Sequence, residues 1–115
     1  MEEKIIELIR NRTEFPLTAF KNVLPEISGE YDFHFPTEGV DKSNILLVSH
    51  VTEEFMSAIN NLIDKKVLSI EPCDFHVVAF DSGEIYDLPL VKGKRLQYKR
   101  LHWLPLLIKK GPQFR

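Results

Sequence analysis

Two stretches of the chain repeat apolar residues at helical spacing. Residues 2–12 begin with acidic side chains and end with arginines, which suits the dipole of a helix. Residues 52–66 begin with Thr52, a good N-cap residue, followed by two glutamates in the first turn. The apolar stripes are Ile5, Ile6, Leu8 and Ile9 in the first stretch, and Phe55, Met56, Ile59, Leu62 and Ile63 in the second. The pattern predicts a helix in each stretch.

The segment between these helices carries weaker signals. Pro16 suits a first helical turn, and the apolar spacing after it predicts a short helix that stops near residues 22–24, because Pro25 cannot continue it. Residues 25–44 mix proline and glycine with aromatic residues, which predicts a loop with one extended piece at 31–35. The apolar run "NILLVS" (44–49) fits a short strand or another small helix, and its periodicity leaves both open.

The stretch after the second predicted helix reads as a β-hairpin. Residues 67–80, "VLSIEPCDFHVVAF", are rich in β-branched and aromatic residues, and residues 84–91 resume the apolar pattern. The intervening "DSG" (81–83) is typical of a tight turn. Pro72 and Pro89 would place the ends of both strands at a sheet edge.

Helices, then a capped helix, then a hairpin is the element order of a winged helix. The join "NNLIDKKVLSIEP" (60–72) resembles the junction between recognition helix and first wing strand in the winged helix-turn-helix superfamily. The resemblance covers residues 43–91. It implies an α+β fold of winged-helix type, with the 52–66 helix in a DNA major groove and the 81–84 tip on the backbone. Residues 13–42 hold more loop than such a core needs, and residues 92–115 lie outside its pattern.

The helix that the resemblance would place on DNA is poorly suited to read it alone. Its first turn carries Glu53 and Glu54, which repel phosphate. The side chains on it that are suited to read DNA are Ser57, Asn60, Asn61 and Lys65, of which Ser57, Asn60 and Asn61 could reach base edges. We therefore expect any base contacts of this helix to be secondary to another binding surface.

Charge is sorted along the chain. The whole sequence of 115 residues has 15 Lys and Arg against 17 Asp and Glu, but residues 1–91 carry 7 basic and 17 acidic side chains, and residues 92–115 carry 8 and none. This asymmetry predicts a basic face for an anionic polymer, in a single domain (1–115) whose C-terminal extension packs on the core. Phosphate contacts are predicted for Lys92, Lys94, Arg95, Lys99 and Arg100, helped by Lys109 and Lys110, with Tyr98 stacking or bracing a strand.

Other uses of the basic segment stay open. The segment could lie across the acidic body and neutralise it, or it could meet an acidic protein partner. Residues 101–108, "LHWLPLLI", are too apolar to remain in water, so we expect Trp103, Leu104, Leu106 and Leu107 in the core. Pro105 makes this stretch a poor central strand or helix. Alternatively, the apolar run could cross between the protomers of a homodimer.

Catalytic chemistry finds little support in the sequence. "CDFH" places Cys73 and His76 on opposite faces of a predicted strand, and the four histidines lack metal-ligand spacing. Asp81, Glu84 and Asp87 suit a solvated turn better than a metal-dependent nuclease, and the five scattered glycines form no phosphate loop. We expect no enzyme activity, cofactor or metal.

The sequence therefore predicts a small cytoplasmic protein, bacterial or phage-like in its economy, with no membrane segment. The predicted function is that of a non-catalytic regulatory protein that binds DNA, such as a transcription regulator. The alternative is a protein–protein interaction module, an adaptor or inhibitor, that uses the acidic surface around Glu53, Glu54, Asp81 and Glu84; this alternative leaves a homodimer open.

Overall fold

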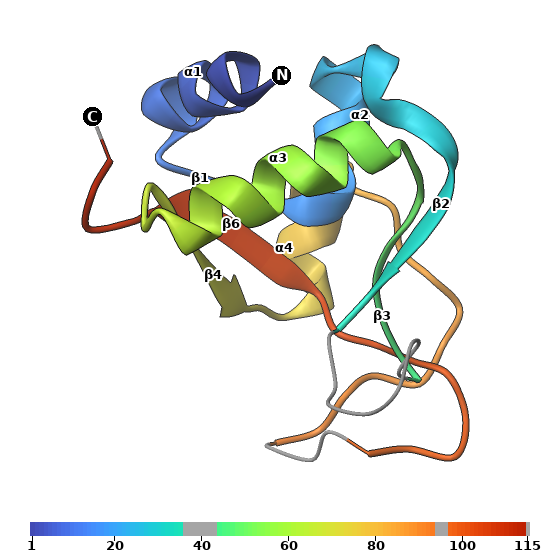
Figure 1. Ribbon diagram of the computed structural model, residues 1–115. Helices are drawn as coiled ribbons and strands as arrows, with labels where there is room; N and C mark the ends of the chain where they lie inside the picture. Colours follow the sequence, from blue (N-terminus) through green and yellow to red (C-terminus); the bar gives the residue numbers. More distant parts are fainter. Residues whose placement is uncertain (36–43, 94–96, 115) are drawn as a thin grey trace.

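The computed structural model describes residues 1–35, 44–93 and 97–114, and within them the chain is a mixed α+β structure (Figure 1). The helices are α1 (Glu2–Arg12), α2 (Phe20–Val23), α3 (Glu53–Asp64) and α4 (Phe75–Phe80), with 3-10 turns at Leu17–Ala19 and Pro25–Ile27. The strands are β1 (Glu14–Pro16), β2 (Ser28–His34), β3 (Ile45–Val51), β4 (Leu68–Pro72), β5 (His102–Trp103) and β6 (Leu106–Lys110).

The strands form two small sheets. One has the order β1–β6–β4 with antiparallel pairing throughout. The other has the order β2–β3–β5, in which β2 pairs antiparallel and β5 pairs parallel with β3. The C-terminal segment supplies a strand to each sheet, so it is part of the folded core.

The central position of β6 corrects one expectation from the sequence. Pro105 was expected to make this stretch a poor central strand, yet β6 has a partner strand on each side. Proline has no N–H to donate to a neighbouring strand. Because Pro105 lies just before the first residue of β6, the pairing of β6 loses no hydrogen bond. Trp103, Leu106 and Leu107 are buried as expected, whereas Leu104 is only half-buried. Within the single chain, this run therefore packs in the chain's own core, and a homodimer that crosses through it stays a prediction.

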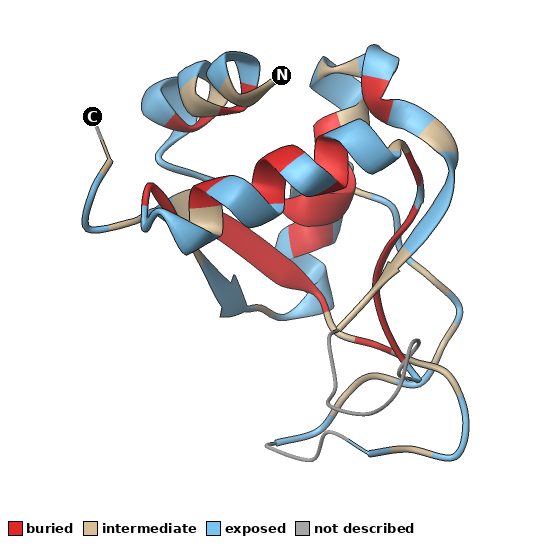
Figure 2. Cartoon of the chain, viewed as in Figure 1, coloured by how far each residue is buried: buried red, intermediate tan, exposed pale blue. Residues whose placement is uncertain are grey.

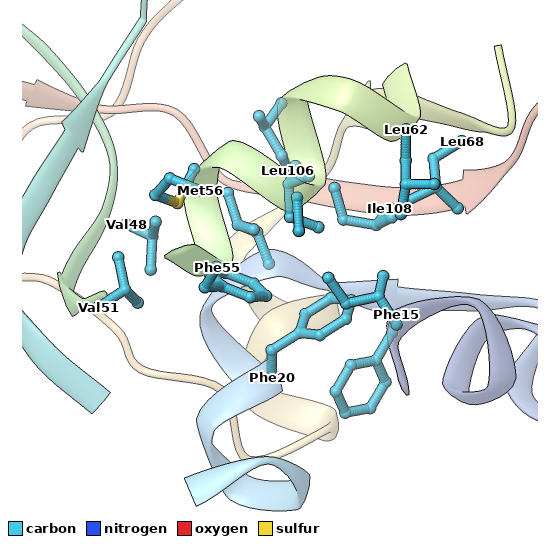
Figure 3. Close-up of a cluster of buried hydrophobic side chains, with 14 of the residues drawn as sticks. Phe15, Phe20, Val48, Val51, Phe55, Met56, Leu62, Leu68, Leu106 and Ile108 are labelled. Atoms are coloured by element: carbon cyan, nitrogen blue, oxygen red, sulfur yellow. The ribbon is translucent and has the colours of Figure 1, made fainter. Parts of the chain in front are cut away.

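The core lies between α3 and β6, and Figure 3 shows side chains of both pointing into it. The rings of Phe15 and Phe20 meet edge to face at 5.2 Å, and Phe20 reaches Phe55 of α3 at 5.5 Å. Figure 2 shows most of β3 and the first part of β6 as buried, and the buried residues of β6 are Leu106, Leu107 and Ile108. Such aromatic and aliphatic burial is the main stabilising term in a domain of this size.

The two periodic helices are confirmed. α1 has the predicted bounds, and α3 begins where Thr52 accepts a hydrogen bond from the Phe55 N–H at 3.2 Å. Residues 45–51 form a strand, which decides the alternative that the apolar run left open. The helix predicted after Pro16 is confirmed only in part, because β1 and a 3-10 turn precede the four residues of α2. The extended piece predicted at 31–35 is β2, which starts earlier, at Ser28.

The predicted hairpin is wrong. β4 ends at Pro72, and the residues expected to continue it form α4 instead. The Asp74 side chain caps this helix by accepting the His76 N–H at 2.9 Å. At its other end Ser82 has a positive φ of 58°, and the Ser82 and Gly83 N–H groups donate to the Ala79 and Val78 carbonyls at 3.0 and 2.9 Å. The "DSG" sequence is therefore a helix C-cap and not a hairpin turn.

The segment after α4 also departs from the predicted wing. Leu90 forms a parallel bridge with Trp103, and the Val91 N–H donates to the Trp103 carbonyl at 3.0 Å. This segment therefore lies against β5 and not against β4. α3 followed by β4 keeps the order of a winged helix, but α4 occupies the place of the wing. No helix of the described residues has the length and apolar character needed to cross a membrane.

Candidate nucleic-acid interface

The basic C-terminal segment divides into two parts with different surroundings. One part is β6, whose Lys109 and Lys110 lie at the end of a core strand. The other part is the chain around residues 92 and 97–102, which Figure 1 shows at the end of the molecule away from α3. The sequence predicts phosphate contacts for both parts, whereas the structure gives the two parts different neighbours.

The charge of Lys109 is matched within the chain. Its ammonium lies 2.6 Å from the Glu71 carboxylate on β4 and 3.7 Å from Glu14 on β1. The hydrogen bond to Glu71, and then the charge of that carboxylate, raise the pKa of Lys109 above its ordinary value. The Lys110 ammonium lies 5.2 Å from the centre of the Phe114 ring. One alternative was that the acidic body neutralises the basic segment. The structure shows this neutralisation at Lys109.

The second part surrounds a hollow of about 600 Å³, here called the basic hollow. Its lining is Pro89, Leu90, Lys92, Tyr98, Lys99, Arg100 and His102. Lys92, Lys99 and Arg100 are exposed, and none of them forms an ion pair with a carboxylate in the described parts of the chain. The hollow therefore combines unmatched positive charge with apolar and aromatic walls.

A ring stack forms part of this wall. The rings of Tyr98 and His102 lie 3.7 Å apart between centroids and 20° from parallel. The Tyr98 hydroxyl accepts the Lys92 N–H at 3.0 Å, and the Tyr98 carbonyl accepts from the Asn44 amide at 2.8 Å. His102 Nδ1 lies 2.8 Å from the Arg100 carbonyl, so this nitrogen carries a proton. Contacts with Lys92, Asn44 and Arg100 thus hold the two rings in place within the chain itself.

β5 explains why these residues come together. His102 and Trp103 pair in parallel with Ile45 and Leu46 of β3, and Trp103 is fully buried. The Trp103 ring meets Tyr86 edge to face at 5.1 Å. Because successive side chains of a strand point to opposite sides, burying Trp103 leaves the ring of His102 on the outer side, beside the hollow.

The polar residues predicted on α3 are not part of this hollow. Ser57, Asn60 and Asn61 are all exposed, but Figure 1 places α3 far from the 97–102 segment. The structure does not bring the two predicted groups of nucleic-acid contacts together. Lys94 and Arg95 lie outside the described residues.

Sequence reasoning missed a polar network around Tyr86, the residue whose ring meets Trp103. Lys21 lies 2.7 Å from the Glu84 carboxylate and donates to the Ser49 carbonyl at 2.9 Å. The Tyr86 hydroxyl accepts the Ser49 N–H at 2.8 Å and donates to Glu84 at 3.1 Å. Burial, above all, raises the pKa of Tyr86. No sequence signal marks this network, because its members are far apart in the chain and turn residues such as Glu84 are usually solvated.

Asp32 extends the network on β2. It accepts a hydrogen bond from the Ser49 hydroxyl, which lowers the pKa of the Asp32 carboxyl below its ordinary value. The N–H of His50 adds a longer contact of 3.4 Å. The arrangement holds β2 against β3 and so supports the strand on which β5 lies.

The residues considered for catalysis do not converge. Burial raises the pKa of the Cys73 thiol to about 11, so it is protonated at neutral pH and a weak nucleophile. His76 contacts Asp74 at 2.7 Å. Glu84 faces Lys21, and no three His, Cys, Asp or Glu residues of the described ranges come together as a metal site would require.

No family model, curated protein or solved structure matches this chain.

Proposed function

We propose that this protein is a non-catalytic regulatory protein that binds nucleic acid through the basic hollow. The observation that supports this most is the meeting of three cations without described ionic partners, Lys92, Lys99 and Arg100, with a preformed ring stack. Cations bind phosphates and release counterions, while rings stack on unpaired bases. The two kinds of contact lie within one hollow.

The proposal favours single-stranded over duplex nucleic acid. A base can reach the Tyr98–His102 stack only when it is unpaired, because bases within a duplex are stacked on each other. Reading of a major groove by Ser57, Asn60 and Asn61 would use another side of the molecule. DNA remains the predicted polymer, and a winged-helix relationship of residues 43–91 remains a proposal that rests on the order α3–β4.

The test is a titration of fluorescein-labelled single-stranded DNA of about 20 nucleotides, and of its duplex, followed by fluorescence anisotropy. We expect micromolar binding near about 50 mM salt, tighter for the single strand, and weaker as salt increases. Absence of binding at low salt, or affinity independent of salt, would overturn the proposal. Tighter binding of the duplex would overturn the role of the stack alone.

Contact with another protein is the second candidate function. It is favoured by two exposed glutamates in the first turn of α3, Glu53 and Glu54; Figure 1 shows α3 away from the 97–102 segment. Retention on heparin and on an anion exchanger separates the candidates. Strong heparin retention supports the basic hollow, and strong anion exchange without heparin retention supports the acidic surface.

A further inference from the structure

The outward face of α4 is unusually apolar for a surface. Phe80 is 89% exposed, and Phe75 and Val77 of the same helix are 37% and 39% exposed. Among the residues of α4 only Val78 is buried. An aromatic ring this accessible, beside other apolar side chains, marks a surface that another molecule covers.

A hollow of about 570 Å³, here called the α4 hollow, lies beside this face. Its apolar lining comes from Phe15, Val77 and Phe80, and its polar lining from Arg12, Glu14, His76 and Asp81. The α4 hollow shares no residue with the basic hollow. An apolar centre with a charged rim is the usual composition of a protein interface.

The charges of this rim identify the occupant. Arg12 stacks over the Phe15 ring at 5.0 Å and forms no ion pair with a described carboxylate, and Asp81 forms none with a described cation. One rim thus carries an unmatched positive and an unmatched negative group. In a twofold dimer every contact forms twice. If one residue of the first copy contacts a different residue of the second copy, the same pair also forms with the two copies exchanged. A surface that carries both a positive and a negative group can therefore pair with a second copy of itself. A purely acidic partner would leave Asp81 without an opposite charge, and a purely basic partner would leave Arg12 without one.

We propose that the α4 face is the interface between two copies of the chain. Phe80 of each copy enters the α4 hollow of the other. Arg12 of each copy contacts the partner's Asp81, so this ion pair forms twice. This inference does not depend on nucleic-acid binding.

The helix that presents Phe80 is held firmly in place. Asp74 caps its start, the Gly83 N–H closes its end on Val78, and buried Val78 anchors it to the core. A Cβ atom at Gly83 would lie 2.6 Å from a methyl group of Val78, so this close approach requires glycine. A side chain on a fixed helix loses little conformational entropy on binding, which favours association.

The first test is the mass of the full chain in solution, measured by sedimentation velocity from about 1 to 100 µM. We expect a monomer–dimer equilibrium in this range. Phe80→Glu should raise the dissociation constant at least about tenfold, because it places a charge in the apolar centre. The matched control is Tyr31→Glu, which places the same charge at another exposed aromatic ring, on β2, and should leave the equilibrium unchanged. Thermal melts of both variants check that each of them folds.

The second test uses the reciprocal charges. Arg12→Asp alone and Asp81→Arg alone each create two like-charge contacts across the twofold axis, so each should be monomeric. An equimolar mixture restores two opposite-charge contacts and should form a heterodimer. A monomeric parent chain at all concentrations, an unaffected Phe80→Glu dimer, or a mixture that stays monomeric would each overturn the inference.

Discussion

The two parts of the basic segment both carry lysines, but the surroundings of those lysines differ. In β6 the apolar residues are buried on both sides of a sheet, and Lys109 meets two carboxylates on the neighbouring strands. Around the basic hollow, Lys92, Lys99 and Arg100 stand beside rings, with no ion pair to a described carboxylate. A run of like charges therefore does not define one surface. The strands next to each residue decide whether its charge is matched inside the protein or available to a ligand.

The largest expected difference between the two parts is in stability. Ile108 of β6 is fully buried between α3 and the sheet, so Ile108→Ala should lower the free energy of unfolding by about 2–5 kcal/mol. Arg100→Ala at the rim of the hollow should change it by less than about 0.5 kcal/mol. Urea denaturation followed by circular dichroism measures both. Equal losses would show that the hollow is as structural as the strand.

The next effect concerns the ring stack. Tyr98→Ala should weaken binding of single-stranded DNA by about 1–3 kcal/mol, the usual contribution of one stacked base, and should affect duplex binding less. Tyr31→Ala removes an exposed ring from β2 and is the matched control. Anisotropy titrations at one salt concentration give the comparison. If Tyr98→Ala left single-strand affinity unchanged, the rings would be a brace for the loop and not a platform for bases.

The smallest effect is the pH dependence of the Lys109 contacts. The raised pKa of Lys109 means that its stabilising effect is complete below about pH 10.5, the ordinary value, and is lost as the pH rises through the higher pKa of the folded state. Lys109→Gln should therefore make the melting temperature fall less steeply between about pH 9 and 11.5. Lys99→Gln removes an equal charge from the basic hollow as a control. Identical pH profiles for Lys109→Gln and the parent would show that the contact with Glu71 has no influence on stability.

Strong local signals made part of the fold predictable. α1 and α3 follow from apolar periodicity and end charges, and the cap at Thr52 is where the sequence places it. The burial of Trp103 follows from its apolar neighbours. These features depend on residues close together in the chain, which is why one sequence suffices to find them.

The failures arose where one local signal serves two structures. The β-branched and aromatic side chains within residues 75–80 favour a strand, but the Asp74 cap and the buried Val78 stabilise a helix there. The "DSG" sequence fits a hairpin turn and a helix C-cap equally, since both need a residue with positive φ. Pairing of β5 with β3 joins residues more than fifty positions apart, and no local pattern reveals it.

The sequence could predict several residues of the candidate site, but not which of the basic residues lie together in the folded chain. The sequence identified Lys92, Tyr98, Lys99 and Arg100, all of which line the basic hollow. It also gave the same role to Lys109, whose partners Glu14 and Glu71 come from two other strands. Separating the two groups requires knowing which strands pair, and that is a property of the folded chain.

The most direct test of the central claim compares two variants that remove charge from the two parts. One variant carries Lys92→Gln, Lys99→Gln and Arg100→Gln, and the other carries Lys109→Gln and Lys110→Gln. The measurement is the slope of log affinity for single-stranded DNA against log salt concentration. We predict that the slope becomes shallower by about 2 in the hollow variant, because three phosphate contacts are lost, and changes little in the strand variant. An equal or larger change in the strand variant would contradict the account.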